Sequence, residues 1–478
     1  MEDLTAASAI EVTGLLRKGD VRPGELLDQI EARMNRVEPL LNALVSPCFD
    51  RARQHARQIE SLPVAERGLL AGLPVSIKDL TAVAGVRTTW GSTLYGDHVP
   101  AASDSLVTHL EAEGGVVYAK SNSPEMGVGG NTFNDVFGPT RNPWNLARTA
   151  GGSSGGAAAS LAAHTSWLST GSDSGGSLRT PAAFCGVVGL RPTPFRVPNS
   201  PSGNPFDLIA VDGPMARDVR DVALFLDAMA WADPAVPFAA PLPAAGYLAA
   251  AERPKERAAI AFSPDLGLGC INPDIAGPVT AAVEKLARSG FDVRPTDLSL
   301  KSMDRAYHTF RALEFAASFG DLGAAERKHF KPELNWNIDR GLALSGSDII
   351  AATRERAAAF DRLLALLDEV DVLVCPATSV AAFPVEERYH GAARQIGDEH
   401  YLDWLSIAYV LTALAVPVLV IPCGLTDEGL PVGIQIIGRP NGEAALLSVG
   451  AALESALRPW AKGANPSMAL LDRQLCLG

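Results

Sequence analysis

The stretch GGSSGGAAAS, residues 151–160, sets two serines between two pairs of glycines and then continues into small helix-forming residues. Glycine lets the backbone adopt conformations closed to other residues and lets a backbone N–H come close to a ligand. The run AAASLAA that follows, residues 157–163, predicts a helix whose start lies near Ser153 or Ser154. Because the start of a helix also suits an anion or a developing oxyanion, the stretch indicates a functional site.

Two other interpretations of these residues stay open at this point. Gly/Ser-rich runs are most often flexible connectors, although this one is only six residues long and leads directly into a helix. The pattern G-x-S-x-G, here Gly151, Ser153 and Gly155, is also that of the nucleophile turn of an α/β-hydrolase. That enzyme class needs an Asp and a His further along the chain.

The composition is that of a large globular protein. Its 478 residues are 47% hydrophobic and 20% charged, and no low-complexity linker divides them, so we expect one large domain. A formal charge of −13 repels phosphate backbones and anionic lipid, so we expect no nucleic-acid partner.

The cysteines and the first residues indicate the compartment. The start, MEDLTAASAIEV, lacks the basic segment and apolar run of a secretory signal, so we expect a cytoplasmic protein. The cysteines are scattered without a C-x-x-C pair, which implies neither a zinc site nor a disulfide framework: Cys48, Cys185, Cys270, Cys375, Cys423 and Cys476.

One stretch imitates a membrane span. Residues 405–425, LSIAYVLTALAVPVLVIPCGL, contain no charge and are long enough to cross a bilayer. Pro417 and Pro422 argue against a continuous helix. A buried helix that ends before Pro417, followed by a buried strand VLVI, explains the same residues, so we expect no membrane association.

The order of strand and helix signals predicts the fold class. The first 65 residues show apolar positions at three- and four-residue spacing, which predicts a helical segment, 1–65, packed on the core. Beyond it, β-rich runs such as GLPVSIKD, GGVVYAKS, SWLSTGSD and DVLVCPAT alternate with helical segments. This alternation favours an α/β fold for residues 66–478, with a large mixed, mostly parallel β-sheet covered by helices on both faces.

A second serine motif lies twenty-four residues beyond the first, in GSDSGGSLRTPAAFCGVVGLRP, residues 171–192. Its glycines leave the backbone N–H groups of Ser174, Gly175, Gly176 and Ser177 free to converge on one point, which is what an oxyanion hole requires. A glycine turn before a helix is the alternative explanation.

A nucleophilic serine needs a base, because a hydroxyl is nearly inert at neutral pH. None of the eight histidines lies in a glycine-rich or strand-end setting. Lys78 lies instead at the end of the apolar run GLPVSIKDL, residues 72–80. If its amine is desolvated, its pKa falls, and a drop of about three units would leave a neutral base near pH 7.

Together these residues resemble the amidase signature family. The Lys in GLPVSIKD, the GGSSGG stretch and the D-x-GGS stretch are similar to the Ser-cisSer-Lys triad of that family. The resemblance covers roughly residues 65–455 and implies the amidase signature fold for the main domain. It extends to further blocks of sequence at 122–159, 171–192, 211–229, 370–378 and 429–440.

The resemblance implies a role for each matching residue. Ser177 corresponds to the nucleophile, Ser153 to the bridging serine after a cis peptide bond, Lys78 to the base and Ser154 to a supporting residue. The implied reaction is hydrolysis of a carbon–nitrogen bond of a linear amide through a serine acyl-enzyme. Family members also act on aryl amides, esters and carbamates, and the reaction requires no metal and no organic cofactor.

The resemblance says less about substrate contacts. In the family, the loop after the NSPE block lines the acyl-binding cavity, which makes Met126, Gly127 and Ser153 candidate substrate-binding residues, with Phe133 a further candidate. The segment of about 232–350 corresponds to a variable, substrate-lining insertion. Its aromatic residues form either an apolar lid over a bulky substrate or part of the core: Tyr307, Phe310, Phe315, Phe330 and Trp336.

Three alternatives can be compared with a free-standing amidase. The glutaminase subunit of the tRNA-dependent amidotransferase resembles the chain in the same blocks, but it typically has Gln where this chain has Thr180. Its tyrosine-rich helix is also absent, because DIIAATRERAAAF, residues 348–360, occupies that place. An α/β-hydrolase that uses Ser153 with a histidine, and a noncatalytic binding protein on the same scaffold, are the others. We favour an amidase with a small-molecule amide substrate, and a homodimer because family members are often dimers.

Overall fold

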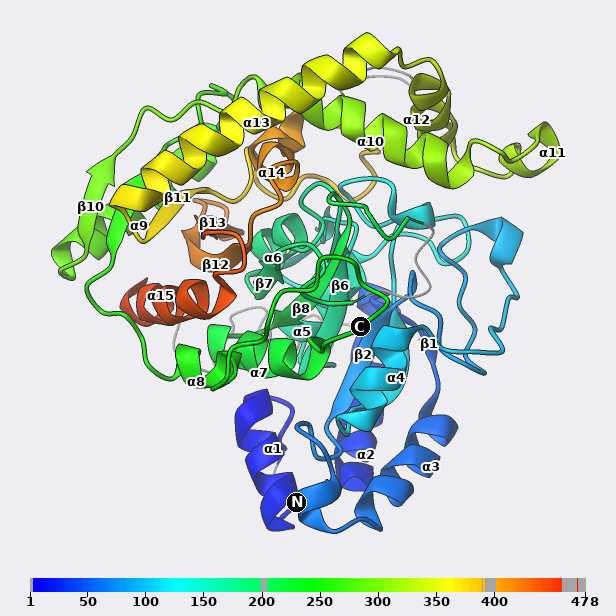
Figure 1. Ribbon diagram of the computed structural model, residues 1–478. Helices are drawn as coiled ribbons and strands as arrows, with labels where there is room; N and C mark the ends of the chain where they lie inside the picture. The colour runs from blue at the N-terminus through cyan, green and yellow to red at the C-terminus, as the bar shows by residue number, and fades with distance from the viewer. Residues whose placement is uncertain (1–2, 199–203, 389, 392–400, 458–470, 472–478) are drawn as a thin grey trace.

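The computed structural model describes residues 3–198, 204–388, 390–391, 401–457 and 471 (Figure 1). Its central feature is a mixed sheet of eleven strands with helices on both faces, so the chain has the expected α/β class. A separate hairpin pairs β4 (Arg141–Asn142) with β5 (Asn145–Thr149). In order across the large sheet, the strands are β1 (Leu44–Pro47), β3 (Val116–Ser121), β2 (Pro74–Lys78), β6 (Leu168–Asp173), β8 (Val211–Ala216), β7 (Val188–Arg191), β12 (Val418–Leu425), β13 (Pro431–Ile437), β11 (Val372–Pro376), β9 (Ala259–Phe262) and β10 (Asp292–Pro295).

Parallel pairing is confined to two parts of this sheet. Strands β3, β2 and β6 run parallel on one side, and β11, β9 and β10 do so on the other. The strands between them, from β6 through β8, β7, β12 and β13 to β11, pair antiparallel, and so do β1 and β3. The expectation of a mostly parallel sheet therefore holds only for the two flanks. In the centre, β8 inserts between β6 and β7, and the short turn between β12 and β13 forces an antiparallel hairpin.

Both faces of the sheet are covered because its strands are apolar on both sides. In β12, Leu419 and Ile421 belong to a core cluster that also contains residues of the helices α2, α7, α9 and α15. Val420 points to the opposite face and packs with residues of the small-residue helices α5 and α6. Such strands give continuous apolar sequences instead of alternating ones. The bounds of these helices are α2 (Pro23–Leu41), α5 (Gly155–Ala162), α6 (Arg179–Cys185), α7 (Val219–Met229), α9 (Pro273–Arg288) and α15 (Glu443–Leu457).

The N-terminal segment packs into the same core. Helix α1 (Ala9–Lys18) begins with a capping box formed by Ser8 and Glu11. The carboxylate of Asp221, in α7, accepts hydrogen bonds from the backbone N–H groups of Ala9 and Ile10 at 2.7 and 3.0 Å. These bonds satisfy two of the N–H groups that a helix leaves unpaired at its start. These two hydrogen bonds attach α1 to the main domain. The other helices in this part of the molecule are α3 (Phe49–Glu60), α4 (Ser105–Ala112) and α8 (Tyr247–Ala251).

A second group of helices lies at the top of the view in Figure 1 and comes mainly from the 232–350 region. Its members are α10 (Met303–Phe319), α11 (Ala324–Arg327), α12 (Pro332–Leu342) and the long α13 (Gly346–Glu369). Residues of α10, α13 and α14 (Ser406–Thr412) form one core cluster with Leu373 and Ile437 of the sheet. This layer faces the edge of the sheet at which β2 and β6 end.

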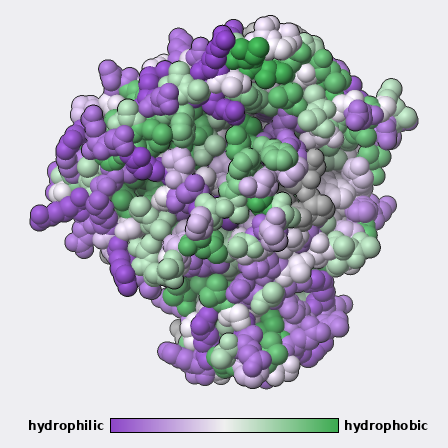
Figure 2. Space-filling view, viewed as in Figure 1, coloured by the Kyte–Doolittle hydropathy of each residue, from purple (hydrophilic) through white to green (hydrophobic). Residues whose placement is uncertain are grey.

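The apolar stretch 405–425 divides as the sequence predicts. It forms α14, which ends before Pro417, and then β12, which continues through Pro422 with a shift in register. Among the described residues, no helix combines the length and the hydropathy that crossing a bilayer would require. Figure 2 shows hydrophilic and hydrophobic residues interspersed on this face, with hydrophilic residues dense along the rim where β10 and α9 lie.

Candidate active site

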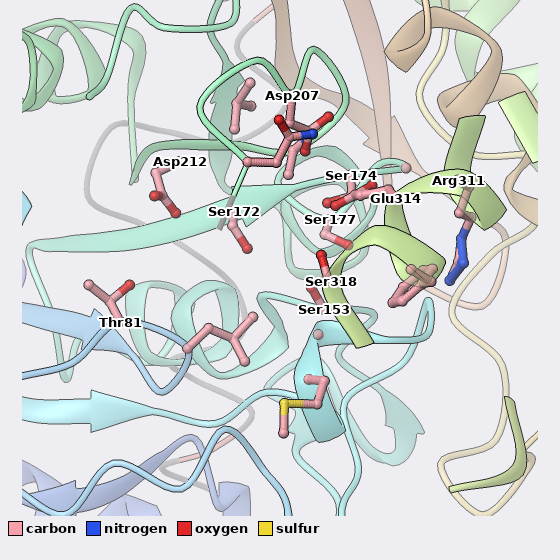
Figure 3. A pocket seen from close by; sticks show the side chains of 18 of the residues that line it. Thr81, Ser153, Ser172, Ser174, Ser177, Asp207, Asp212, Arg311, Glu314 and Ser318 are labelled. Carbon is pink, nitrogen blue, oxygen red and sulfur yellow. The ribbon is translucent and has the colours of Figure 1, made fainter. Parts of the chain in front are cut away.

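The serines of both motifs meet at one cavity of about 870 Å³. Strands β2 and β6 run parallel, so their carboxyl ends reach the same edge of the sheet, and the start of α5 lies beside them. Figure 3 shows Ser153, Ser172, Ser174 and Ser177 directed into this space. Lys78, the last residue of β2, lies just beneath its floor with 1% of its surface exposed.

The Lys78 amine is surrounded by three hydroxyl groups. Its Nζ atom donates to the Oγ atoms of Ser153, Ser154 and Ser172 at 2.7, 2.8 and 2.9 Å. Ser154 is the N-cap residue of α5, and the peptide bond between Gly152 and Ser153 is cis. A hydroxyl either donates or accepts a hydrogen bond, so the same three contacts suit both the ammonium and the neutral amine.

Burial sets the protonation of this amine. Desolvation lowers the pKa of Lys78 to about 7, while the carboxylates of Asp212 and Asp173 act in the opposite direction. Asp212 is the cross-strand partner of Ser172, so its side chain lies on the same face of the sheet. Burial raises the pKa of Asp212 to about 6, opposed by the charge of Lys78. Near neutral pH, a large fraction of Lys78 is therefore an uncharged amine.

Ser177 lies in the glycine loop that follows β6. Its carbonyl oxygen accepts a hydrogen bond from the Ser154 backbone N–H at 3.3 Å, which joins the two serine motifs. Its side chain is partly exposed and lines the same cavity as Ser153 (Figure 3).

The backbone N–H groups of the loop are not equivalent. Those of Ser174, Gly175 and Ser177 have no hydrogen-bond partner within the described parts of the chain, and all three residues line the cavity. The Gly176 N–H donates instead to Asp173 Oδ1 at 2.9 Å, and Gly176 does not line the cavity. The expectation of four converging N–H groups is therefore wrong for Gly176, because a carboxylate outside the cavity already binds its N–H, and it stays a prediction for the other three.

Asp173 holds this loop in place. Its carboxylate accepts from Arg179 at 3.0 Å through both Nε and Nη2, and from the Leu178 backbone N–H at 3.1 Å. Arg191 also contacts Asp173, and all three charged side chains are fully buried. Burial alone would raise the pKa of Asp173, but the two arginines outweigh it and hold the pKa below the ordinary range. The loop thus rests on an ion-pair network.

The predicted substrate contacts divide into two groups. Met126 and Gly127 line the cavity, and a Cβ atom on Gly127 would lie 3.8 Å from Ser153 Oγ. Phe133 is not among the lining residues, so that candidate is wrong. Its ring lies 5.8 Å from Lys331 Nζ and 5.3 Å from Arg388 Cζ, which makes it a partner of two cations.

The aromatic residues of the 232–350 region also have two different roles. Tyr307 and Phe315 line the cavity, whereas Phe310, Phe330 and Trp336 do not. Phe310 and Phe330 belong to hydrophobic core clusters, and Trp336 packs edge-on against Tyr401 at 5.8 Å. The core alternative is therefore correct for Phe310 and Phe330, whereas a lid formed by Tyr307 and Phe315 stays a prediction.

Several lining residues could not be identified from the sequence. Glu314 lies at the cavity with Asp207, and burial followed by the charge of Asp207 raises the pKa of Glu314 to about 8. Arg311 donates to the Asn337 side chain and lies 4.7 Å from the centre of the Phe315 ring. Their only sequence signal is helical spacing, because Arg311, Glu314, Phe315 and Ser318 share one face of α10.

Other kinds of site are not supported by the described residues. None of their histidines lines the cavity, and His400 lies outside them. No group of three His, Cys, Asp or Glu side chains in the same residues is arranged to hold a metal ion. The five cysteines of the described part are free thiols, and Cys476 lies outside it.

Comparison with known proteins gives consistent results. The family model described as Amidase matches residues 25–447. The chain is 34% identical to an acylamidase of Rhodococcus erythropolis over 96% of its own length and 97% of the relative's. It is also 31% identical to one component of the glutamyl-tRNA(Gln) amidotransferase of Sulfurihydrogenibium sp., over 95% and 98% of the two chains. Among solved structures, a bacterial aryl acylamidase of the amidase signature family superposes with a TM-score of 0.87 at 28% identity, covering 96% and 98%.

Proposed function

Because this chain belongs to the amidase signature family and hydrolyses amide carbon–nitrogen bonds, we propose that it is a free-standing amidase that acts through an acyl-enzyme on Ser177. The observation that carries the proposal is the contact of Lys78 Nζ with Ser153 Oγ at 2.7 Å, with both residues buried. A neutral amine there is a base, and Ser153 connects it to the cavity in which Ser177 lies.

The first half of the reaction is a proton relay. Neutral Lys78 takes the hydroxyl proton of Ser153, and Ser153 takes that of Ser177. The Ser177 oxygen then attacks the amide carbonyl carbon and forms a tetrahedral intermediate. The unpaired N–H groups of Ser174, Gly175 and Ser177 stabilise its oxyanion.

The second half releases both products. The proton returns through Ser153 to the amide nitrogen, the carbon–nitrogen bond breaks, and the amine leaves while the acyl group stays on Ser177. The same relay then deprotonates a water molecule, which attacks the ester carbonyl. Collapse of that intermediate gives the carboxylic acid and returns the proton to Ser177, so no metal or organic cofactor is consumed.

The cavity wall favours a substrate with an apolar group. Leu80, Trp90, Met126, Phe315 and Leu405 supply apolar surface around the serines. Arg311 and Glu314 of α10, together with Asp207, add charged groups to the cavity wall (Figure 3). We therefore propose aryl or alkyl amides as substrates, with esters and carbamates as reactive analogues, and the acylamidase relative supports this choice.

The second candidate function is the glutaminase component of a tRNA-dependent amidotransferase, which the 31% identical relative supports. Against it, Thr180 stands where that group typically has Gln, and its side chain is buried in α6. Copurification with partner proteins, together with tRNA-dependent activity, would reverse the order of the two candidates.

The helical segment 1–65 and the main domain 66–478 form one folding unit, since both contribute to one core cluster. Free cysteines suit a reducing compartment, so we place the enzyme in the cytoplasm. The net charge of −13 argues against nucleic-acid binding, and a homodimer is the proposed assembly.

A hydrolysis screen tests the proposal. Purified protein is offered anilides, aliphatic amides, aryl esters and aryl carbamates, with Ser177→Ala as the blank. We expect amide hydrolysis and labelling of Ser177 by a fluorophosphonate probe, both absent in Ser177→Ala. Hydrolysis that persists in Ser177→Ala contradicts the assigned nucleophile, and failure of every substrate and of labelling favours a noncatalytic binding protein.

A further inference from the structure

Tyr307, in the second turn of α10, reaches the glycine loop from outside the segment that carries the reacting groups. Its hydroxyl donates to the Ser174 carbonyl oxygen at 3.0 Å, and the side chain is 2% exposed. The Tyr307 hydroxyl also lies against the next residue, Gly175, because a Cβ atom built there would be 2.2 Å from Tyr307 Oη. Tyr307 therefore touches the peptide unit that joins Ser174 to Gly175.

The geometry of a peptide bond connects this contact to the site. The Ser174 carbonyl and the Gly175 N–H belong to one planar unit, and they point in opposite directions in a trans peptide. Within the described residues, only the bond between Gly152 and Ser153 is cis, so the 174–175 bond is trans. A hydrogen bond that fixes the carbonyl consequently fixes the direction of the N–H.

The ring of Tyr307 is itself held in position. It stacks on Tyr409 of α14 with ring centres 4.4 Å apart and an angle of 7° between the planes. The Tyr409 hydroxyl donates in turn to Asp304, one turn before Tyr307 on α10. Two helices therefore fix the donor, and the donor fixes the peptide.

We propose that Tyr307 is a positioning residue that aims the Gly175 N–H at the oxyanion of the reaction. The proposal rests on the amidase function proposed above. A donor that already points at the developing charge stabilises the transition state without reorganisation. Without the Tyr307 hydroxyl, the 174–175 peptide can rotate, and its N–H spends part of its time directed elsewhere. Substrate binding does not depend on this donor to the same degree, so the effect should fall on kcat.

Tyr307→Phe is the primary test, with Tyr118→Phe as the matched control. The Tyr118 hydroxyl also donates to a buried backbone carbonyl, that of Thr165 at 2.5 Å, but it lies away from the cavity. We expect Tyr307→Phe to lower kcat about 3- to 10-fold with KM nearly unchanged, as for the loss of one hydrogen bond. The inhibition constant of an aryl trifluoromethyl ketone, whose adduct carries an oxyanion, should weaken by the same factor. Tyr118→Phe should leave kcat unchanged.

Gly175→Ala provides an independent test. The backbone of Gly175 has no left-handed φ, so alanine is excluded there mainly by the Tyr307 hydroxyl. Once that hydroxyl is removed, the nearest remaining atom is Tyr307 Cζ, at 3.2 Å. We expect Gly175→Ala to be severely impaired alone and to recover part of its activity when combined with Tyr307→Phe.

The outcomes separate this proposal from the function on which it rests. If wild-type protein shows no Ser177-dependent hydrolysis, the amidase function fails, and the role of Tyr307 fails with it. If wild-type protein hydrolyses amides but Tyr307→Phe raises KM alone, or leaves both kcat and the ketone inhibition unchanged, only the positioning role is overturned. Losses in Tyr307→Phe and Gly175→Ala that simply multiply in the double variant also overturn it.

Discussion

The Nζ atom of Lys78 lies 2.7 Å from the Oγ atom of Ser153, and only 1% of the lysine surface is open to solvent. The two residues come from the end of β2 and from the loop before α5, which only the folded chain brings together. A buried amine beside a hydroxyl is the arrangement that a base without histidine needs.

Replacing Lys78 by methionine should therefore remove catalysis without removing the fold. Methionine has a similar length and introduces no charge, so we expect kcat to fall by about 10³-fold or more while the thermal midpoint stays the same or rises. The measurement is steady-state hydrolysis with a thermal unfolding scan of the same preparation. Turnover that survives in Lys78→Met would contradict Lys78 as the base and would favour the α/β-hydrolase alternative.

The pH dependence follows from the pKa of Lys78. Because burial lowers that pKa to about 7, the neutral base accumulates as pH rises, and kcat/KM should rise with pH through about 7. The Asp212 carboxylate raises the pKa of Lys78, so Asp212→Asn should move the rising limb of the profile to lower pH. The exposed Asp427→Asn serves as the control and should leave the profile in place. A limb that moves upward in Asp212→Asn contradicts this account.

The glycines around Ser153 allow two segments to approach closely. A Cβ atom on Gly156, in α5, would lie 2.3 Å from the Asn122 backbone nitrogen, so Gly156→Ala must displace main chain. We expect a loss of about 1 to 3 kcal/mol in the free energy of unfolding, as for overpacked cores. In α1, Gly14 has no atom within 4 Å of such a Cβ, so Gly14→Ala should stabilise the protein by about 0.5 to 1 kcal/mol. Urea unfolding of both variants measures the difference, and equal effects would show that close approach at Gly156 is unimportant.

Asp173 should be far more important for stability than a surface carboxylate. Asp173→Asn leaves Arg179 and Arg191 buried without their anion, which costs about 3 to 5 kcal/mol. The contribution of Asp173 is present above the pKa of an unfolded aspartate, near 4, and is lost as the pH falls below it. Glu252→Gln, which breaks the exposed ion pair with Arg220, is the control and should change little. Similar unfolding curves for the two variants would show that the buried network is not stabilising.

The sequence was most informative where a chemical requirement leaves a local pattern. The buried strand before Lys78 and the helix start at Ser154 follow from apolar runs and from capping preferences. The stretch 405–425 could be divided because Pro417 disfavours a helical conformation at the residue before it.

What could not be predicted depends on contacts between distant segments. The bond from the Gly176 N–H to Asp173 is local, but the sequence does not show that this carboxylate is buried against Arg191 of β7 as well as Arg179. The order of the central strands depends on β8 entering between β6 and β7. Asp212 and Tyr307 reach the site only through the register of β8 and the packing of α10.

The reacting groups and the opposite wall of the cavity come from separate parts of the chain. Residues 78–177 supply the former, and α10 supplies a large part of the latter. Laboratory evolution toward new substrates can therefore diversify Arg311, Glu314, Phe315 and Ser318 as a compact library. Tyr307 lies one turn before Arg311 on the same helix and should be left out of the library. Randomising it would lower turnover in the clones that lose its hydroxyl, whatever their substrate selectivity.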